Sequence, residues 1–172
     1  MNPYVELARK AVENYLNERM IITPAKNLPK EFFERKAGVF VTIEKDGRLR
    51  GCIGTYLPVR DNIGEEIIHN AIAAATEDYR FGAVKKVELP HLSYIVYILQ
   101  KPEKVLDIAE LNPKKFGIIV KTREKSGLLL PDLEGVNTVA EQIGICCEKA
   151  GIVLKQENVE IYKFTVEKYE EE

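Results

Sequence analysis

The stretch Leu49-Arg50-Gly51-Cys52-Ile53-Gly54-Thr55 combines a thiol, a guanidinium group and two glycines in a pattern that predicts a buried strand. Side chains alternate across a strand, so Arg50 and Cys52 are expected on one face with Gly54, and Gly51 on the other face. Glycine inside a strand costs packing, and it often marks a place where a ligand or another backbone comes close. The heptapeptide therefore predicts a site in which a thiol and a cation are neighbours.

The residues around the heptapeptide fix it within a sheet. Residues 38–44 read as a strand, and Lys45-Asp46-Gly47-Arg48 carries the Asp-Gly signal of a tight hairpin. A helix is expected to begin at Asn62 and to run to about Glu77. One stripe of that helix carries Asn70, Ala74 and either Glu77 or Asp78, which are spaced three or four residues apart. That stripe is expected to direct polar groups toward the heptapeptide.

The rest of the chain alternates helical and extended patterns. We expect a first helix from Pro3 to about Arg19, a strand over 92–99, a hairpin of 118–120 with 128–130, a helix capped by Asn137 and ending at Gly151, and a strand over 159–166. Residues 170–172 are expected to be a disordered, charged tail. Helices interspersed with hairpins indicate an α+β fold with a largely antiparallel sheet flanked by helices.

Composition narrows the class of protein. A chain of 172 residues, 45% hydrophobic and 30% charged, fits a single domain spanning 1–172 with one good core, or a core with a smaller lobe. A net charge of -2 argues against nucleic acid as a partner. No apolar run approaches the roughly 20 residues that cross a bilayer, and the N-terminal residues lack a signal peptide's apolar region, so a cytoplasmic location is expected. The richness in lysine and glutamate leans toward a thermophile.

Metal and disulfide chemistry have little support. The three cysteines include no Cys-x-x-Cys pair, and two of them, Cys146 and Cys147, lie on the apolar side of the last helix, where core packing is expected. His69 is considered as a general base for Cys52, against a surface position beside Glu65. His91 stands beside a proline in a loop. No metal site is predicted.

Cys52 is the candidate nucleophile. A thiolate is the reactive form, and a cation such as Arg50 lowers the pKa of a neighbouring thiol. The alternative is that the cysteine only fills space in the core. Arg50 likewise has the alternative of a surface salt bridge, whereas Arg50 and Arg80 together would form a fork for a carboxylate or phosphate. We expect Asp78 to orient one of the two arginines and to leave the other for a ligand.

Two aromatic residues flank Arg80. Tyr79 and Phe81 are expected either to stack on a planar ligand or to be buried as core anchors, and the sequence leaves both alternatives open.

The heptapeptide resembles the signature of the AMMECR domain family. The resemblance covers nearly the whole chain and continues through Gly38-Val39-Phe40-Val41-Thr42, Asn70-Ala71, Asp78-Tyr79-Arg80-Phe81 and Leu129-Leu130-Pro131. Phe116-Gly117-Ile118 departs from the pattern, since many relatives have histidine at the first position, and the tryptophan that often follows the Leu-Pro stretch is absent. The resemblance implies an AMMECR-like fold, with a larger and a smaller subdomain and a cleft between them.

The resemblance does not supply an activity, because the family's biochemistry is not settled. It does imply an association with MEMO-like and radical-SAM proteins. Two hypotheses follow. In the first, the chain is a cytoplasmic enzyme or enzyme component that binds a small anionic or planar ligand through Arg50, Gly51, Gly54, Asn70, Asp78 and Arg80, with Cys52 as nucleophile or thiol donor and the cofactor unknown. In the second, it is a non-catalytic binding or adaptor module for a MEMO-like or radical-SAM protein partner.

Overall fold

The computed structural model describes residues 1–172 and divides them into two compact units. The larger unit holds residues 1–99 and 167–172, and the smaller unit holds residues 100–166. Each unit contains helices and a four-stranded sheet, and the registered strand pairs are antiparallel. The α+β prediction is therefore confirmed, and the cleft between the subdomains stays a prediction.

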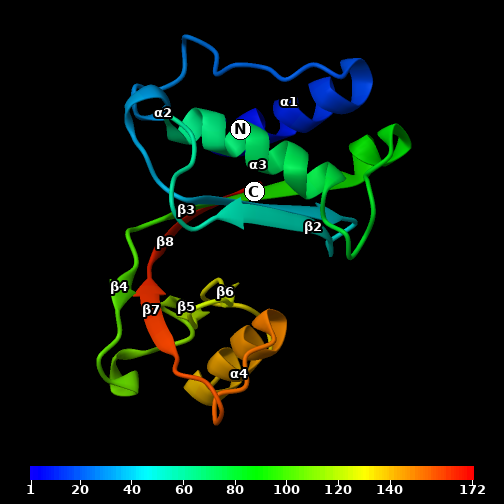
Figure 1. The fold of residues 1–172 in the computed structure, drawn as a ribbon. Helices are drawn as coiled ribbons and strands as arrows, with labels where there is room; N and C mark the ends of the chain where they lie inside the picture. The colour runs from blue at the N-terminus through cyan, green and yellow to red at the C-terminus, as the bar shows by residue number, and fades with distance from the viewer. The chain divides into compact units, whose positions relative to one another are not determined.

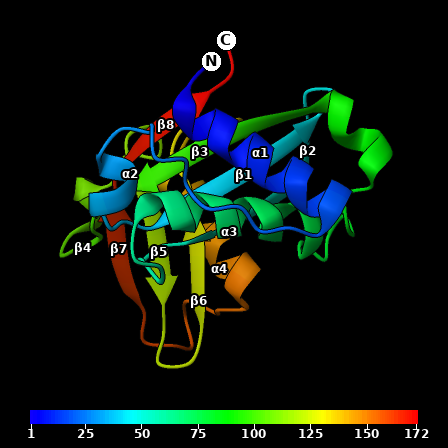
Figure 2. The same ribbon diagram turned by 90° about the horizontal axis from the view of Figure 1, so that it is seen from above.

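The larger unit places its two long helices on one face of a sheet with strand order β2-β1-β3-β8 (Figures 1 and 2). Its elements are α1 (Pro3–Glu18), α2 (Glu31–Glu34), β1 (Val39–Lys45), β2 (Arg48–Thr55), α3 (Ile63–Thr76), the 3-10 helix η1 (Lys86–His91), β3 (Leu92–Leu99) and β8 (Val166–Glu170).

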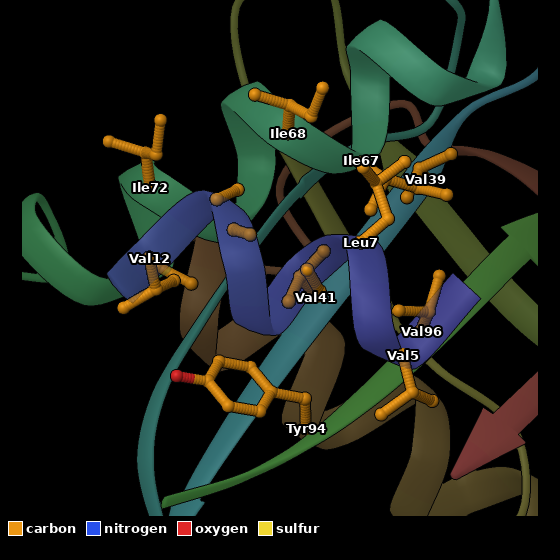
Figure 3. Close-up of a cluster of buried hydrophobic side chains, with 14 of the residues drawn as sticks. Val5, Leu7, Val12, Val39, Val41, Ile67, Ile68, Ile72, Tyr94 and Val96 are labelled. Atoms are coloured by element: carbon orange, nitrogen blue, oxygen red, sulfur yellow. The ribbon is translucent and has the colours of Figure 1, made fainter. Parts of the chain in front are cut away.

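The core of the larger unit lies between these helices and the sheet. Figure 3 shows its apolar side chains, which come from α1 (Val5, Leu7, Val12), α3 (Ile67, Ile68, Ile72), β1 (Val39, Val41) and β3 (Tyr94, Val96). Nearly all of them are excluded from solvent. Burying a valine, leucine or isoleucine side chain contributes about 1.5–3 kcal/mol, so this layer accounts for much of the stability of the unit.

Two helix starts and the first hairpin agree with the sequence prediction. The side chain of Asn2 accepts a hydrogen bond from the Tyr4 amide, and that of Asn62 accepts one from the Glu65 amide. The hairpin closes at the Lys45–Arg48 pair, with positive φ angles of 50° at Asp46 and 76° at Gly47. Such angles suit an Asp-Gly turn, because glycine and aspartate tolerate the left-handed region.

The prediction that the heptapeptide forms a buried strand is wrong. β2 is the edge strand of its sheet, and Leu49 is 45% exposed. The register shifts between Ile43 and Glu44, so that Gly51 pairs with Ile43 and Leu49 with Glu44. Arg50 is therefore the extra residue of a bulge, a feature that is common at sheet edges.

The C-terminal segment also differs from the prediction. The expected strand over 159–166 is two strands, β7 (Glu160–Phe164) and β8, separated at Thr165 and belonging to different sheets. Glu170 ends β8, and Glu171 forms an ion pair with Arg9 of α1.

The smaller unit has strand order β4-β7-β5-β6 with helix α4 packed against β5 and β6. Its elements are β4 (Glu103–Lys104), the 3-10 helix η2 (Ile108–Glu110), β5 (Gly117–Lys121), β6 (Ser126–Leu129), α4 (Val139–Ala150) and β7. Thr138, not the predicted Asn137, caps α4 by accepting from the Glu141 amide. Cys146 and Cys147 are buried in the core, as expected.

Candidate functional site

Cys52 lies in the middle of β2, half-buried and opposite Thr42 of β1. The Thr42 hydroxyl donates to the Cys52 sulfur at 3.2 Å. Paired residues of antiparallel strands share a face. The thiol therefore lies on the face of the sheet opposite to Gly51, which is covered by α3.

Asp78 joins the backbone of Cys52 to Arg80. Its Oδ2 accepts the Cys52 amide hydrogen bond at 3.0 Å. Its two oxygens also accept from Arg80, at 3.0 Å from Nε and 2.8 Å from Nη2. The hydrogen bonds from Arg80, joined by that from the Cys52 amide, lower the pKa of Asp78 to about 2 against the opposing effect of burial. The Asp78 carboxylate is only 4% exposed, so it is a fixed negative charge at the edge of β2.

Arg80 is the cation that the structure brings toward the thiol. Hydrogen bonding to Asp78 raises the pKa of Arg80, and the charge of a Cys52 thiolate raises that pKa further. The Arg80 side chain is 43% exposed, and its guanidinium carbon lies 5.2 Å from the centroid of the Phe81 ring. Asp78 thus orients Arg80 and not Arg50, one of the two outcomes expected from the sequence.

Arg50 is engaged within the protein. Its Nε and Nη2 donate to the two oxygens of Glu88 at 2.9 and 3.1 Å, and Nη1 and Nη2 donate to the carbonyls of Gly82 and Ala83 at 3.1 and 3.2 Å. These bonds from Arg50 are the largest cause of the lowering of the Glu88 pKa to about 2. The Arg50 side chain is 15% exposed, so it ties β2 to residues 82–88.

Glu88 had no role in the sequence prediction, although the sequence offered a local signal for it. It stands three residues after Lys85, whose amide it caps at 2.7 Å. That spacing is typical of a capping box.

Asn70 and Glu66 hold the far ends of β1 and β2. The Asn70 side chain donates to the Val39 carbonyl at 2.8 Å and to the Thr55 hydroxyl at 3.3 Å. Glu66, only 1% exposed, accepts from the Thr55 hydroxyl at 2.9 Å and from the amides of Val59 and Arg60. Sequence reasoning missed Glu66, whose signal was a carboxylate on the apolar side of α3 one turn before Asn70.

The two glycines of β2 make room for other parts of the protein. A Cβ on Gly51 would overlap the carbonyl oxygen of Ala74 in α3, and a Cβ on Gly54 would overlap the ring of Phe40. These close contacts within the protein account for both glycines of β2, and no ligand is needed to explain them.

Both histidines lie beside carboxylates. His69 is 3.7 Å from Glu65 and His91 is 3.5 Å from Asp46, which agrees with the surface position considered for His69.

Residues 1–172 contain no group of three or more His, Cys, Asp or Glu side chains placed to hold a metal ion. None of the helices is both long and apolar enough to cross a membrane. Tyr79 is 94% exposed, so its alternative as a buried anchor is wrong.

The fold places the chain in the α+β class, with its candidate site at the edge of β2. Comparison with known proteins identifies its family. The chain matches the AMMECR1 family model over residues 5–169, and it belongs to that family. A protein of Thermotoga maritima is 53% identical over 169 residues, which are 98% of this chain and 97% of that protein. The crystal structure of the uncharacterized protein PH0010 from Pyrococcus horikoshii has a TM-score of 0.91 at 36% identity, covering 98% of this chain and 90% of that one.

A longer relative carries the same domain. Protein CA_C1420 of Clostridium acetobutylicum is 48% identical over 171 residues, which are 99% of this chain and only 36% of that protein. The names of these relatives state no activity.

Proposed function

We propose that this protein binds a small anionic or planar ligand beside Cys52 and acts as a cytoplasmic enzyme or enzyme component. One observation carries the proposal, namely the Asp78 carboxylate that accepts from the Cys52 amide and holds Arg80 by two hydrogen bonds. This arrangement keeps a half-exposed guanidinium near a half-buried thiol. A nearby cation stabilises a thiolate, which is the nucleophilic form of cysteine.

The residues have separate roles in this proposal. Cys52 is the nucleophile or thiol donor, and Arg80 binds the anionic part of the ligand. Asp78 orients Arg80, and the Thr42 hydroxyl donates to the sulfur. Arg50, Gly51, Gly54 and Asn70 support β2 through contacts within the protein, so we assign them to positioning the site. The cytoplasmic location suits a thiol that has to stay reduced.

Cysteine alkylation tests the proposal. We expect Cys52 to be alkylated by iodoacetamide well before Cys146 and Cys147, and its rate to level off at a pH below the ordinary thiol pKa of about 8.5. The other two cysteines are internal controls, because burial raises the pKa of Cys146 to about 11 and raises that of Cys147. Mass spectrometry of peptides after short exposures at a series of pH values measures all three rates together.

Variants connect the alkylation rate to the cation. Arg80→Gln is expected to slow alkylation of Cys52 several-fold at neutral pH, while Arg48→Gln, at the exposed start of the same strand, leaves it unchanged. An inert Cys52 in the folded protein, or equal rates in the two variants, would contradict the proposed role of the thiol and Arg80.

A non-catalytic adaptor for a protein partner, such as a MEMO-like or radical-SAM protein, is the second candidate. It is favoured by the internal engagement of Arg50 and Asp78, which leaves fewer polar groups for a substrate. The longer Clostridium relative also favours this candidate, because there the matching region is joined to a further stretch of chain. Cys52→Ser separates the candidates, because it should abolish turnover of a substrate and leave affinity for a partner nearly unchanged.

A further inference from the structure

The turn that follows α3 exposes aromatic and aliphatic side chains. Tyr79 is 94% exposed and Phe81 is 40% exposed, and Val87 of η1 is 79% exposed. Aromatic residues together with arginine are the side chains that most often dominate binding between proteins. An almost fully exposed tyrosine has most of its surface available for burial by a partner.

The backbone that carries these side chains is held at several points. The Gly82 and Ala83 carbonyls accept hydrogen bonds from Arg50, and the Val84 amide donates to the Ala75 carbonyl at 2.7 Å. The Gly82 amide donates to the Asp78 carbonyl at 3.2 Å. A turn that is already ordered loses little conformational entropy on binding, and this preorganisation favours affinity.

On the same segment, most acidic side chains are buried and the basic side chains are exposed. The acidic side chains Asp78 and Glu88 are 4% and 11% exposed and are paired with arginines. The basic side chains point outward, since Arg80 is 43% exposed and Lys85 and Lys86 are exposed. Glu77, at the end of α3, is the one exposed acid among residues 77–88. The outward charge is therefore mainly positive and complements an acidic partner.

We propose that Tyr79, Arg80, Phe81, Lys85 and Val87, here called the turn surface, dock an acidic protein segment that carries an aromatic or aliphatic residue. The apolar residue of the partner packs on Tyr79 and Phe81, and its carboxylates lie near Arg80 and Lys85. This inference rests on the second candidate function and adds to it a surface and the chemistry of the partner.

Peptide selection on the whole chain tests the turn surface. A display library of short random peptides is selected on the immobilised protein, and the enriched peptide is titrated with the protein by fluorescence anisotropy. We expect the enriched sequences to combine Asp or Glu with an aromatic or aliphatic residue. Tyr79→Ala should weaken binding about 30-fold, the loss typical of an interface hot spot. Lys85→Glu should weaken it about 5-fold, and added salt should weaken it as well.

Matched variants control for unrelated effects. Phe33 is 39% exposed, close to the 40% of Phe81, and Lys26 is exposed like Lys85. Phe33→Ala and Lys26→Glu are expected to leave the affinity unchanged, whereas Phe81→Ala lowers it.

Several results would overturn the inference. These are the absence of any enriched peptide, enrichment of basic peptides, and equal affinity for the wild type and Tyr79→Ala. Polyuridylate RNA or phosphatidylserine vesicles are tested with the same variants, and binding of either one in place of the peptide would assign the surface to another class of partner. If Cys52→Ser abolishes peptide binding and Tyr79→Ala does not, the peptide lies at the thiol, so the turn surface fails while the ligand-binding function stands.

Discussion

Replacement of Gly51 by alanine is expected to destabilise the larger unit strongly. The added Cβ would overlap the carbonyl oxygen of Ala74 and lie 3.2 Å from its carbonyl carbon. The overlap with the oxygen is the tighter of the two contacts, because ordinary van der Waals contact begins at about 3.4 Å, so the backbone of α3 has to retreat by roughly 1 Å. Helix α3 is itself packed on α1 and β1, and backbone cannot turn aside as a flexible side chain can.

The magnitude follows from overpacking. Forcing an extra carbon into a filled core costs about 1–3 kcal/mol, and a clash with backbone places Gly51→Ala near the upper end. The smaller entropy of the unfolded alanine variant offsets about 0.4–1 kcal/mol of this. We expect a net loss of about 2 kcal/mol, which lowers the urea midpoint by about 1 M at a typical slope of about 2 kcal/mol/M.

Urea unfolding followed by far-ultraviolet circular dichroism measures the effect, with hydrogen exchange of the β2 peptides to localise it. The control is Gly144→Ala in α4, where a Cβ would meet no atom within 4 Å. Alanine is favoured over glycine in a helix by about 1 kcal/mol, so this control should keep or raise the midpoint. An unchanged midpoint for Gly51→Ala would refute the close approach of α3 to β2.

Three further predictions concern buried polar groups. Asp78 and Glu88 both have a pKa of about 2 in the folded chain, below the unfolded values near 4. Each carboxylate therefore contributes about 2–3 kcal/mol, which is fully present above about pH 5 and is lost as the pH falls through about 2, as an acid titration of the circular dichroism signal would show. Glu66→Gln replaces one accepting carboxylate oxygen with an amide group that only donates, among neighbours that are themselves donors. We expect the free energy of unfolding to fall by about 1–3 kcal/mol and hydrogen exchange at residues 59 and 60 to become faster. Arg50→Lys cannot keep both bonds to Glu88, and the expected loss is about 2 kcal/mol in urea unfolding.

The parts of the fold that depend on local chemistry could be predicted from the sequence. Helix α1 begins at Pro3 and α3 is capped by Asn62, both as expected, and Asp46-Gly47 forms the expected hairpin turn. Local chemistry has a limit even here. Asn137 and Thr138 are adjacent residues that both suit a helix cap, and their spacing alone does not choose between them.

The parts that depend on distant residues could not be predicted in this way. The edge position of β2 follows from β1 pairing with β3 on its other side, which no feature of the heptapeptide encodes. The partner of Arg50 is 38 residues away, so the sequence suggested an arginine near the thiol but not its ion pair with Glu88. Asp78 is expected from the sequence to orient one of the two arginines, and it pairs with Arg80, which is only two residues away.

The two acceptor roles of Asp78 make the turn and the thiol thermodynamically dependent on each other. A partner that draws the Arg80 guanidinium away also changes the carboxylate that accepts from the Cys52 amide. If both proposals hold, occupancy of the turn surface alters the affinity of the thiol site for its ligand, and that ligand alters the affinity for the partner by the same factor. The single buried carboxylate of Asp78 would thus couple binding at the exposed turn surface to binding at the half-buried thiol, without any movement of the sheet.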